Sequence, residues 1–269
     1  MPSINPPYTH YAAFDFINRP EVEGSILGAV TMFGVTPGVN QFNNYAKGRY
    51  NMPWSFAGWQ PLVVSGVVGF GTCLTVKNLL GRNQKDASPF QQAWTSTAGG
   101  AVSGWALCPF ENINTNYSES VRKTVQSIYT QRGIKGFFNG SVSMILREGG
   151  WGFTIMSAIP SISKNMRDAG YNRATADFFA LFLSASAFGL ISTPVNILRA
   201  KKQKMDHAIP EKAPSYLELV PTLFARNQVS TLVKTAMMRT ATSGCAATIF
   251  YYSQQAYRGT FPQPSAYSR

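Results

Sequence analysis

The chain has 269 residues and a formal net charge of +12, yet only 13% of its residues are charged and 45% are hydrophobic. Soluble domains usually carry about 25% charged residues, so this composition favours a membrane protein. The positive charge indicates anionic surroundings, but the basic residues are dispersed, without a zinc-finger spacing or a continuous basic helix. We therefore expect no nucleic-acid partner.

Six segments without a formal charge follow one another along the chain. They span residues 24–46, 50–76, 87–110, 149–163, 178–198 and 240–257. A membrane-spanning helix needs about 20 mostly apolar residues, and all but the fourth segment come near this length. Arg147 and Glu148 extend the fourth helix if they face a watery interior. We expect an all-α membrane protein with six transmembrane helices; a soluble all-helical domain is the alternative.

Small residues are frequent in these segments, and glycines recur four residues apart. The pairs are Gly24/Gly28, Gly34/Gly38 and Gly100/Gly104. In lipid the hydrophobic effect does not drive helices together, so small residues that let two backbones approach are a favoured route to packing. Any single pair also arises by chance in a glycine-rich chain, but three pairs favour close helix packing.

Residue types that bind metals or attack substrates form no recognisable pattern. Cys73, Cys108 and Cys245 are far apart in apolar context, which predicts buried free thiols rather than a disulfide or a metal site. His10 and His207 lack neighbours typical of a metal site or a catalytic triad. We expect no catalytic residue, no metal, no cofactor and no enzymatic activity.

A proline near the end of each odd-numbered segment marks an internal repeat. GVTPGVNQFNNY (34–45), LCPFENINTNYS (107–118) and STPVNILRAKKQ (192–203) contain Pro37, Pro109 and Pro194. Each proline is expected to kink its helix, because it lacks an amide donor and clashes with the preceding turn. A second stretch follows each proline motif and leads into an even-numbered segment. The chain therefore divides into three pseudo-symmetric helix pairs.

The third copy of the motif resembles the signature of the mitochondrial carrier family. That signature is Pro-x-acid-x-x-base-x-base, usually followed by x-Gln. The stretch PVNILRAKKQ keeps Pro194, Arg199, Lys201 and Gln203 but has Asn196 at the acidic position.

The other two copies depart further from the carrier signature. PFENINTNYS keeps Pro109 and Glu111 but has Asn114 where the first base belongs, and PGVNQFNN keeps only Pro37. The stretch GIKGFFNG (133–140), which precedes Arg147, is the best match outside the proline motifs. The resemblance covers roughly residues 24–257.

The resemblance also divides the chain into segments. It implies an extended N-terminal arm at 1–23, repeats at 24–85, 86–173 and 174–257, and a C-terminal tail at 258–269. Pro37 lies much closer to Gly58 than Pro109 does to Gly140, so the first repeat is shortened and its surface helix is missing or reduced to a turn.

Two sets of site residues are implied by the resemblance. Solute-contact positions, relic or active, are Ser65, Arg147, Glu148 and Arg239. The matrix-side gate network comprises Glu111, Arg199 and Gln203, and its one remaining ion pair joins Glu111 to Arg199.

Both gates are expected to be largely lost. Val39, Phe42, Asn114 and Asn196 fill the other positions of the matrix-side ring. The segments expected at the opposite gate, VKNLLG, AIPSIS and FYYSQQ, hold no acid with its base.

With both gates degenerate, the resemblance implies a structural accessory subunit of a respiratory-chain complex in the mitochondrial inner membrane. The alternative is an active carrier of an anionic or zwitterionic metabolite. The basic residues of 199–204 favour a matrix side for that region and contact with anionic phospholipid such as cardiolipin, which places both termini toward the intermembrane space. Expected partners are lipids and neighbouring subunits, contacted by both termini and by helix surfaces.

Overall fold

The computed structural model describes residues 19–47, 49, 51–81, 88–204, 215–225 and 229–260. Helix accounts for 87% of these residues and none of them is in a strand, which confirms the all-α class. The predicted arm and tail, 1–23 and 258–269, lie mostly outside the described residues. The parts that are described are helical rather than extended, because the first helix begins at Pro20 and the last ends at Thr260.

Long helices alternate with short ones along the chain. In order they are α2 (Pro20–Ala46), α3 (Trp59–Gly81), α4 (Pro89–Thr115), α5 (Val121–Arg132), η1 (Ile134–Phe138), α6 (Ser141–Phe153), η2 (Thr154–Ala158), α7 (Ile159–Asp168), α8 (Arg173–Ile191), α9 (Thr193–Gln203), α10 (Tyr216–Phe224) and α11 (Val229–Thr260).

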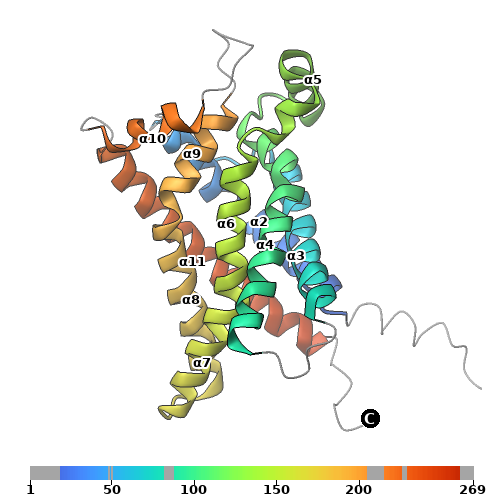
Figure 1. Cartoon of the computed structure of the whole chain (residues 1–269), viewed down its shortest axis with the longest axis vertical. Coiled ribbons are helices and arrows are strands. Elements are labelled where there is room, and N and C mark those ends of the chain that lie inside the picture. Colours follow the sequence, from blue (N-terminus) through green and yellow to red (C-terminus); the bar gives the residue numbers. More distant parts are fainter. Residues whose placement is uncertain are drawn as a thin grey trace, which may run out of the picture.

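The long helices pack in chain order into a closed ring. Helix α2 packs against α3, α3 against α4, and α4 against α6; α7 packs against α8, α8 against α11, and α11 returns to α2. Helices α5, α9 and α10 lie at one end of the ring and α7 lies at the other (Figure 1). We call these the α5 end and the α7 end. The start of α2 and the end of α11 meet at the α7 end, where Glu23 accepts a hydrogen bond from Arg258 Nε at 3.1 Å.

Prolines interrupt two of the long helical segments. The fifth charge-free segment breaks between α8 and α9, where Ser192 separates the two helices and Pro194 lies in the first turn of α9. Between α6 and α7, the chain forms one π-helical turn just before Pro160. Proline has no N–H to donate to the preceding turn, which accounts for a wider turn there. Pro37 and Pro109, by contrast, lie inside the continuous helices α2 and α4.

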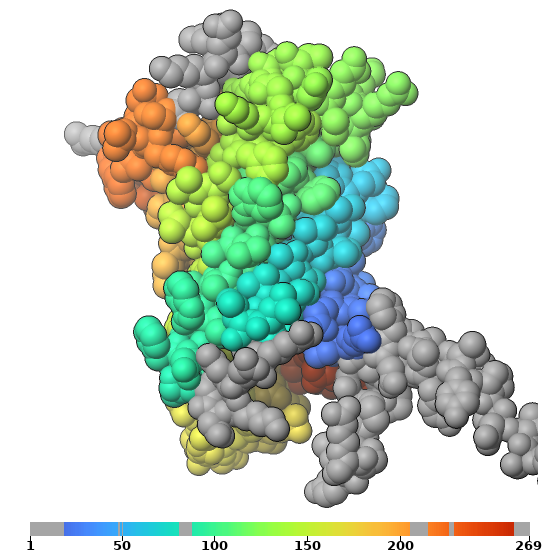
Figure 2. Space-filling view, turned by 45° about the vertical axis from the view of Figure 1, so that its right-hand side comes forward, coloured from blue at the N-terminus to red at the C-terminus, as the bar shows by residue number. Residues whose placement is uncertain are grey.

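Glycines allow the backbones of neighbouring helices to touch, as the glycine spacing predicts. A Cβ atom added at Gly100 of α4 would lie 2.0 Å from the backbone oxygen of Glu148 in α6, and one at Gly28 of α2 would lie 2.5 Å from that of Gly66 in α3. Neither position accepts a larger residue unless the helices move apart. Figure 2 shows α3 (cyan) and α4 (green) side by side on the outer face of the ring.

Three of the described helical segments are long and apolar enough to cross a membrane. They are Pro20–Ala46, Trp59–Leu80 and Arg173–Ile191. Length and composition thus support a membrane protein with at least these three candidate spans. The sequence predicts six spans; α4 and α11 are at least as long as these three but more polar, and the segment from α6 to α7 is interrupted by the π-helical turn.

The connections at the α5 end differ from one helix pair to the next. Between α4 and α6 lie α5 and η1, and between α9 and α11 lies α10. The described residues of 47–58, between α2 and α3, form turns and no helix. This agrees with the prediction that the first surface helix is missing or reduced to a turn.

Candidate functional site

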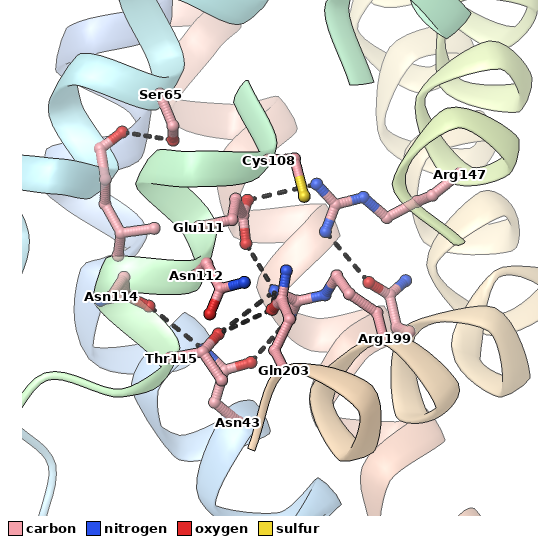
Figure 3. Close-up of polar contacts among 12 residues, drawn as sticks. Asn43, Ser65, Cys108, Glu111, Asn112, Asn114, Thr115, Arg147, Arg199 and Gln203 are labelled. Carbon is pink, nitrogen blue, oxygen red and sulfur yellow. Dashed lines mark hydrogen bonds and ion pairs between the residues drawn. The ribbon is translucent and has the colours of Figure 1, made fainter. Parts of the chain in front are cut away.

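A buried ion network joins α4, α6 and α9 inside the α5 half of the ring. Glu111 of α4 lies between two arginines, with Oε2 2.7 Å from Arg199 Nη1 and Oε1 3.2 Å from Arg147 Nη2 (Figure 3). All three side chains are buried. The predicted ion pair between Glu111 and Arg199 is therefore present. Glu111 also pairs with Arg147, which the sequence assigns to the solute-contact positions and not to the gate.

Arg147 is held by three groups at once. Its Nε donates to Glu148 Oε1 at 2.5 Å, its Nη1 to Asn196 Oδ1 at 3.1 Å, and its Nη2 to Glu111. Two carboxylates and two guanidiniums thus meet in one cluster and balance each other's charge. A buried ion is stable only when paired and hydrogen-bonded in this way.

Amide and hydroxyl groups also accept hydrogen bonds from the Nη atoms of Arg199. Its Nη2 donates to Asn43 Oδ1 at 2.7 Å, and its Nη1 donates to Gln203 Oε1 at 3.0 Å and to Thr115 Oγ1 at 3.4 Å. Thr115 in turn donates to Gln203 Oε1 at 3.1 Å. Through these bonds, Arg199 ties together the ends of α2, α4 and α9.

A second group of polar contacts links α2 to α4 directly. Asn43 Nδ2 donates to Asn114 Oδ1, and Asn114 Nδ2 donates to Asn40 Oδ1, both at 3.2 Å. Asn114 Nδ2 also reaches the carbonyl oxygen of Gly58 at 3.2 Å, and the Lys47 ammonium donates to the carbonyl of Thr115. The α5 end is therefore closed by polar groups that are hydrogen-bonded to one another.

These contacts correct the expectation that the matrix-side closure is largely lost. Ion pairs are indeed few, but amides take over the linking role, with Asn114 and Asn196 each bonded within the network. Sequence reasoning missed Asn43 and Thr115, since the carrier signature points to other positions in these turns. The run NQFNNY, rich in amides at the end of an apolar helix, is a signal that could have indicated Asn43.

A cavity of about 140 Å³ lies inside the ring, on the α7 side of Glu111. Glu148, Arg239 and Ser65 line it together with apolar side chains such as Phe188 and Phe250. The predicted solute-contact residues therefore do share one space. Ser65 contributes little to it, because its hydroxyl donates to the carbonyl of Leu62 in its own helix at 2.7 Å.

Arg239 differs from the other two arginines of the cavity. Unlike Arg147 and Arg199, it pairs with no carboxylate of the described residues. Its Nε is buried and has no hydrogen-bond partner, as is also true of the Nε of Arg199. The guanidinium of Arg239 instead lies over the ring of Phe42, 5.6 Å from the centroid. Because the network balances its own charges, Arg239 leaves the cavity with one net positive charge.

The α7 end is joined by contacts near its rim. Glu23 of α2 accepts from Arg258 Nε at 3.1 Å and from Gln254 Nε2 at 3.3 Å, both in α11. Glu21 accepts from Asn78 of α3 at 2.5 Å. Asn78 and Gln254 belong to segments in which the sequence shows no acid with its base, and the acids they contact come from the start of α2.

All three cysteines are free, as predicted, but they are not all buried. Cys73 and Cys108 are buried, whereas Cys245 is exposed on α11. The expectation of a buried Cys245 is wrong, because a helix in an apolar solvent carries apolar residues on its outer face as well as its inner one. Within the described residues, no group of His, Cys, Asp and Glu side chains is arranged to hold a metal ion.

Comparison with known proteins adds no family or relative. No protein-family model matches the chain, and a search of curated proteins finds no match.

Proposed function

We propose that the chain is a carrier-fold protein of the mitochondrial inner membrane that has lost transport and serves as a structural accessory subunit of a respiratory-chain complex. Support comes from the ring of helices packed in chain order, the three proline motifs and the candidate membrane spans. In this proposal the α5 end faces the matrix, and both termini face the intermembrane space.

One observation carries the loss of transport: Arg147, one of the two arginines expected to contact a solute, is already bound to other side chains. The guanidinium of Arg147 already donates hydrogen bonds to Glu111, Glu148 and Asn196. A solute anion would have to displace a buried carboxylate, which leaves that charge unpaired at a cost of several kcal/mol. Arg147 thus stabilises the contact between α4 and α6 and has no unpaired charge for a solute.

The two ends of the ring support the same proposal. Alternating access requires two states of similar free energy, each closed at one end. The α5 end is closed by a buried network around Arg199. At the α7 end, Glu23 and Glu21 make contacts near the rim. These contacts do not form a buried network like the one around Arg199. One state is therefore stabilised far more than the other.

The outer surface suits contact with lipid and with neighbouring subunits. Helix α4 exposes Phe90 and Trp94 near its start and Trp105 further along. Trp105 stacks on Phe138 of η1, with ring centroids 5.4 Å apart. Aromatic side chains bury much area for few rotatable bonds, so this side of the ring provides contact energy for a neighbouring subunit.

A second candidate function rests on Arg239. A guanidinium with a buried, unpartnered Nε in a cavity with one net positive charge favours an anionic group. An active carrier of an anionic or zwitterionic metabolite is the function that this arrangement would serve. It differs from the first candidate in requiring the α5 end to open.

Native electrophoresis after gentle solubilisation of mitochondria tests the first candidate. The tagged full-length chain should co-migrate with respiratory-chain subunits. A matched version that lacks residues 1–18 and 261–269 measures how much the terminal segments contribute. Migration of the full-length chain only as a free monomer would overturn the proposal.

A further inference from the structure

A second cavity lies at the α5 end, next to the buried ion network. Its volume is about 460 Å³. It is lined by the end of α2, the connection between α2 and α3, the end of α4 and the start of α5. The connection contributes Pro53 and Ser55 to the wall, so a segment that forms no helix borders an open space.

The charges around this cavity all have one sign. Lys47, Arg49 and Lys204 line it, and no carboxylate is among the described lining residues. The remaining wall is rich in hydrogen-bonding side chains, among them Asn44, Asn116 and others from the asparagine- and serine-rich turns. Cations and neutral donors without an acid favour an anionic ligand.

Lys47 shows how crowded the positive charges are. It follows α2 directly, and its ammonium donates to the carbonyl of Thr115. Burial, followed by the positive charges of Arg49, Arg199 and Lys204, lowers the pKa of Lys47 to about 7. A negative charge in the cavity would relieve this repulsion.

We infer that this cavity binds a phosphate group, held by Lys47, Arg49 and Lys204 and by the surrounding amide and hydroxyl donors. A phosphate offers several oxygens and more than one negative charge, so it suits several cations better than a single carboxylate does. A free phosphate and the headgroup of an anionic phospholipid share this chemistry. The inference goes beyond the proposed function, because it requires neither transport nor assembly with other subunits.

Arg49 is the residue through which to test the site. It is exposed and outside any helix, so Arg49→Gln leaves the buried network untouched. Arg122→Gln is the matched control, because Arg122 is an exposed arginine of α5 at the same end but does not line the cavity. Arg49→Lys keeps the charge and should retain most of the binding.

The probes are inorganic phosphate, added to delipidated full-length protein at constant ionic strength, and nanodiscs of phosphatidylcholine with or without cardiolipin. The readout is the thermal unfolding midpoint, which rises when a ligand binds the folded state. We expect one probe to raise the midpoint, Arg49→Gln to weaken its apparent affinity at least tenfold, and Arg122→Gln to leave that affinity unchanged.

The two arms identify the source of the phosphate group. Protection by inorganic phosphate that is lost in Arg49→Gln supports a free phosphate. Protection by cardiolipin alone, lost in the same variant, supports a lipid headgroup. The inference is overturned if neither probe raises the midpoint, or if Arg49→Gln and Arg122→Gln respond alike. Because the protein is tested alone, these outcomes are independent of whether it assembles in a complex.

Discussion

The two ends of the helix ring are held in different ways. At the α5 end, Arg199 is buried and bonded to groups from α2, α4 and its own helix α9. At the α7 end, the pair Glu23–Arg258 joins α2 only to α11, and the arginine is half exposed. One end is therefore linked across several helices through its interior, and the other is linked at the rim.

The α5 end shows that a helix ring can be closed mainly by hydrogen bonds from neutral side chains around a few ion pairs. Asn114 supplies hydrogen bonds at a position where the carrier signature has a base, and Asn43 and Thr115 add hydrogen bonds from positions outside the signature. Neutral amides are less expensive to bury than unpaired charges, and separating a buried amide from its partner without a replacement costs about 1–3 kcal/mol. Such a closure is suited to staying shut, which fits a structural role.

The largest effect should come from Glu111→Gln. The change removes the carboxylate shared by Arg147 and Arg199 and leaves two buried cations with only Glu148 to balance them. Breaking a buried pair in this way costs about 3–5 kcal/mol. We expect a large drop in the thermal unfolding midpoint in detergent.

Glu119→Gln is the control for this prediction. Glu119 pairs with Lys123 on an exposed surface, so the midpoint of this variant should change little. Equal effects would show that the α5 end does not depend on the network.

A smaller loss should follow Gly100→Ala, which tests the wall of the ring between its two ends. The added Cβ would lie 2.0 Å from the backbone oxygen of Glu148, so α4 and α6 must separate. Overpacking of this kind costs about 1–3 kcal/mol. Gly259→Ala is the control, because a Cβ there meets nothing within 4 Å. A midpoint that is as high in Gly100→Ala as in Gly259→Ala would contradict the close packing.

Asn43→Ala should destabilise the α5 end by about 1–2 kcal/mol, as expected when a buried hydrogen-bonding group loses its partner. The change removes the acceptor of Arg199 Nη2 and the donor to Asn114. Asn165→Ala, on the exposed surface of α7, should cause no loss because alanine is the better helix former. Chemical denaturation of both variants measures the difference. If Asn43→Ala is as stable as Asn165→Ala, the amides are not what closes this end.

The smallest effect should come from Glu23→Gln at the α7 end. Its partner Arg258 is half exposed, and such pairs contribute about 0–1 kcal/mol. The same unfolding measurement at low and high salt should show a small loss that salt reduces further. A loss as large as that of Glu111→Gln would remove the contrast between the two ends.

The sequence predicts the all-α class, the pairing of Glu111 with Arg199 and the short first connection. Proline spacing and charge-free runs carry that information locally, so they are readable without the structure. The pairing of Arg147 with Glu111 could not be predicted from the sequence, because it depends on how far α6 is rotated about its axis toward α4.

Other contacts were beyond sequence reasoning for a different reason. Glu23 and Arg258 lie 235 positions apart, in segments expected to be an arm and a tail, and only closure of the ring brings them together. Asn43 and Thr115 were missed because an amide or hydroxyl at a helix end usually serves as a cap or faces water. Only the structure shows them facing Arg199.

Solute exchange in liposomes tests most directly whether the α5 end stays closed. The purified full-length chain would be reconstituted and loaded in turn with nucleotides, phosphate, keto acids and amino acids. Our account predicts exchange no faster than in empty vesicles, because the buried network stabilises one state and the α7 end offers no comparable network for the other. Saturable uptake that Arg147→Ala abolishes would contradict the account and establish the chain as a working carrier.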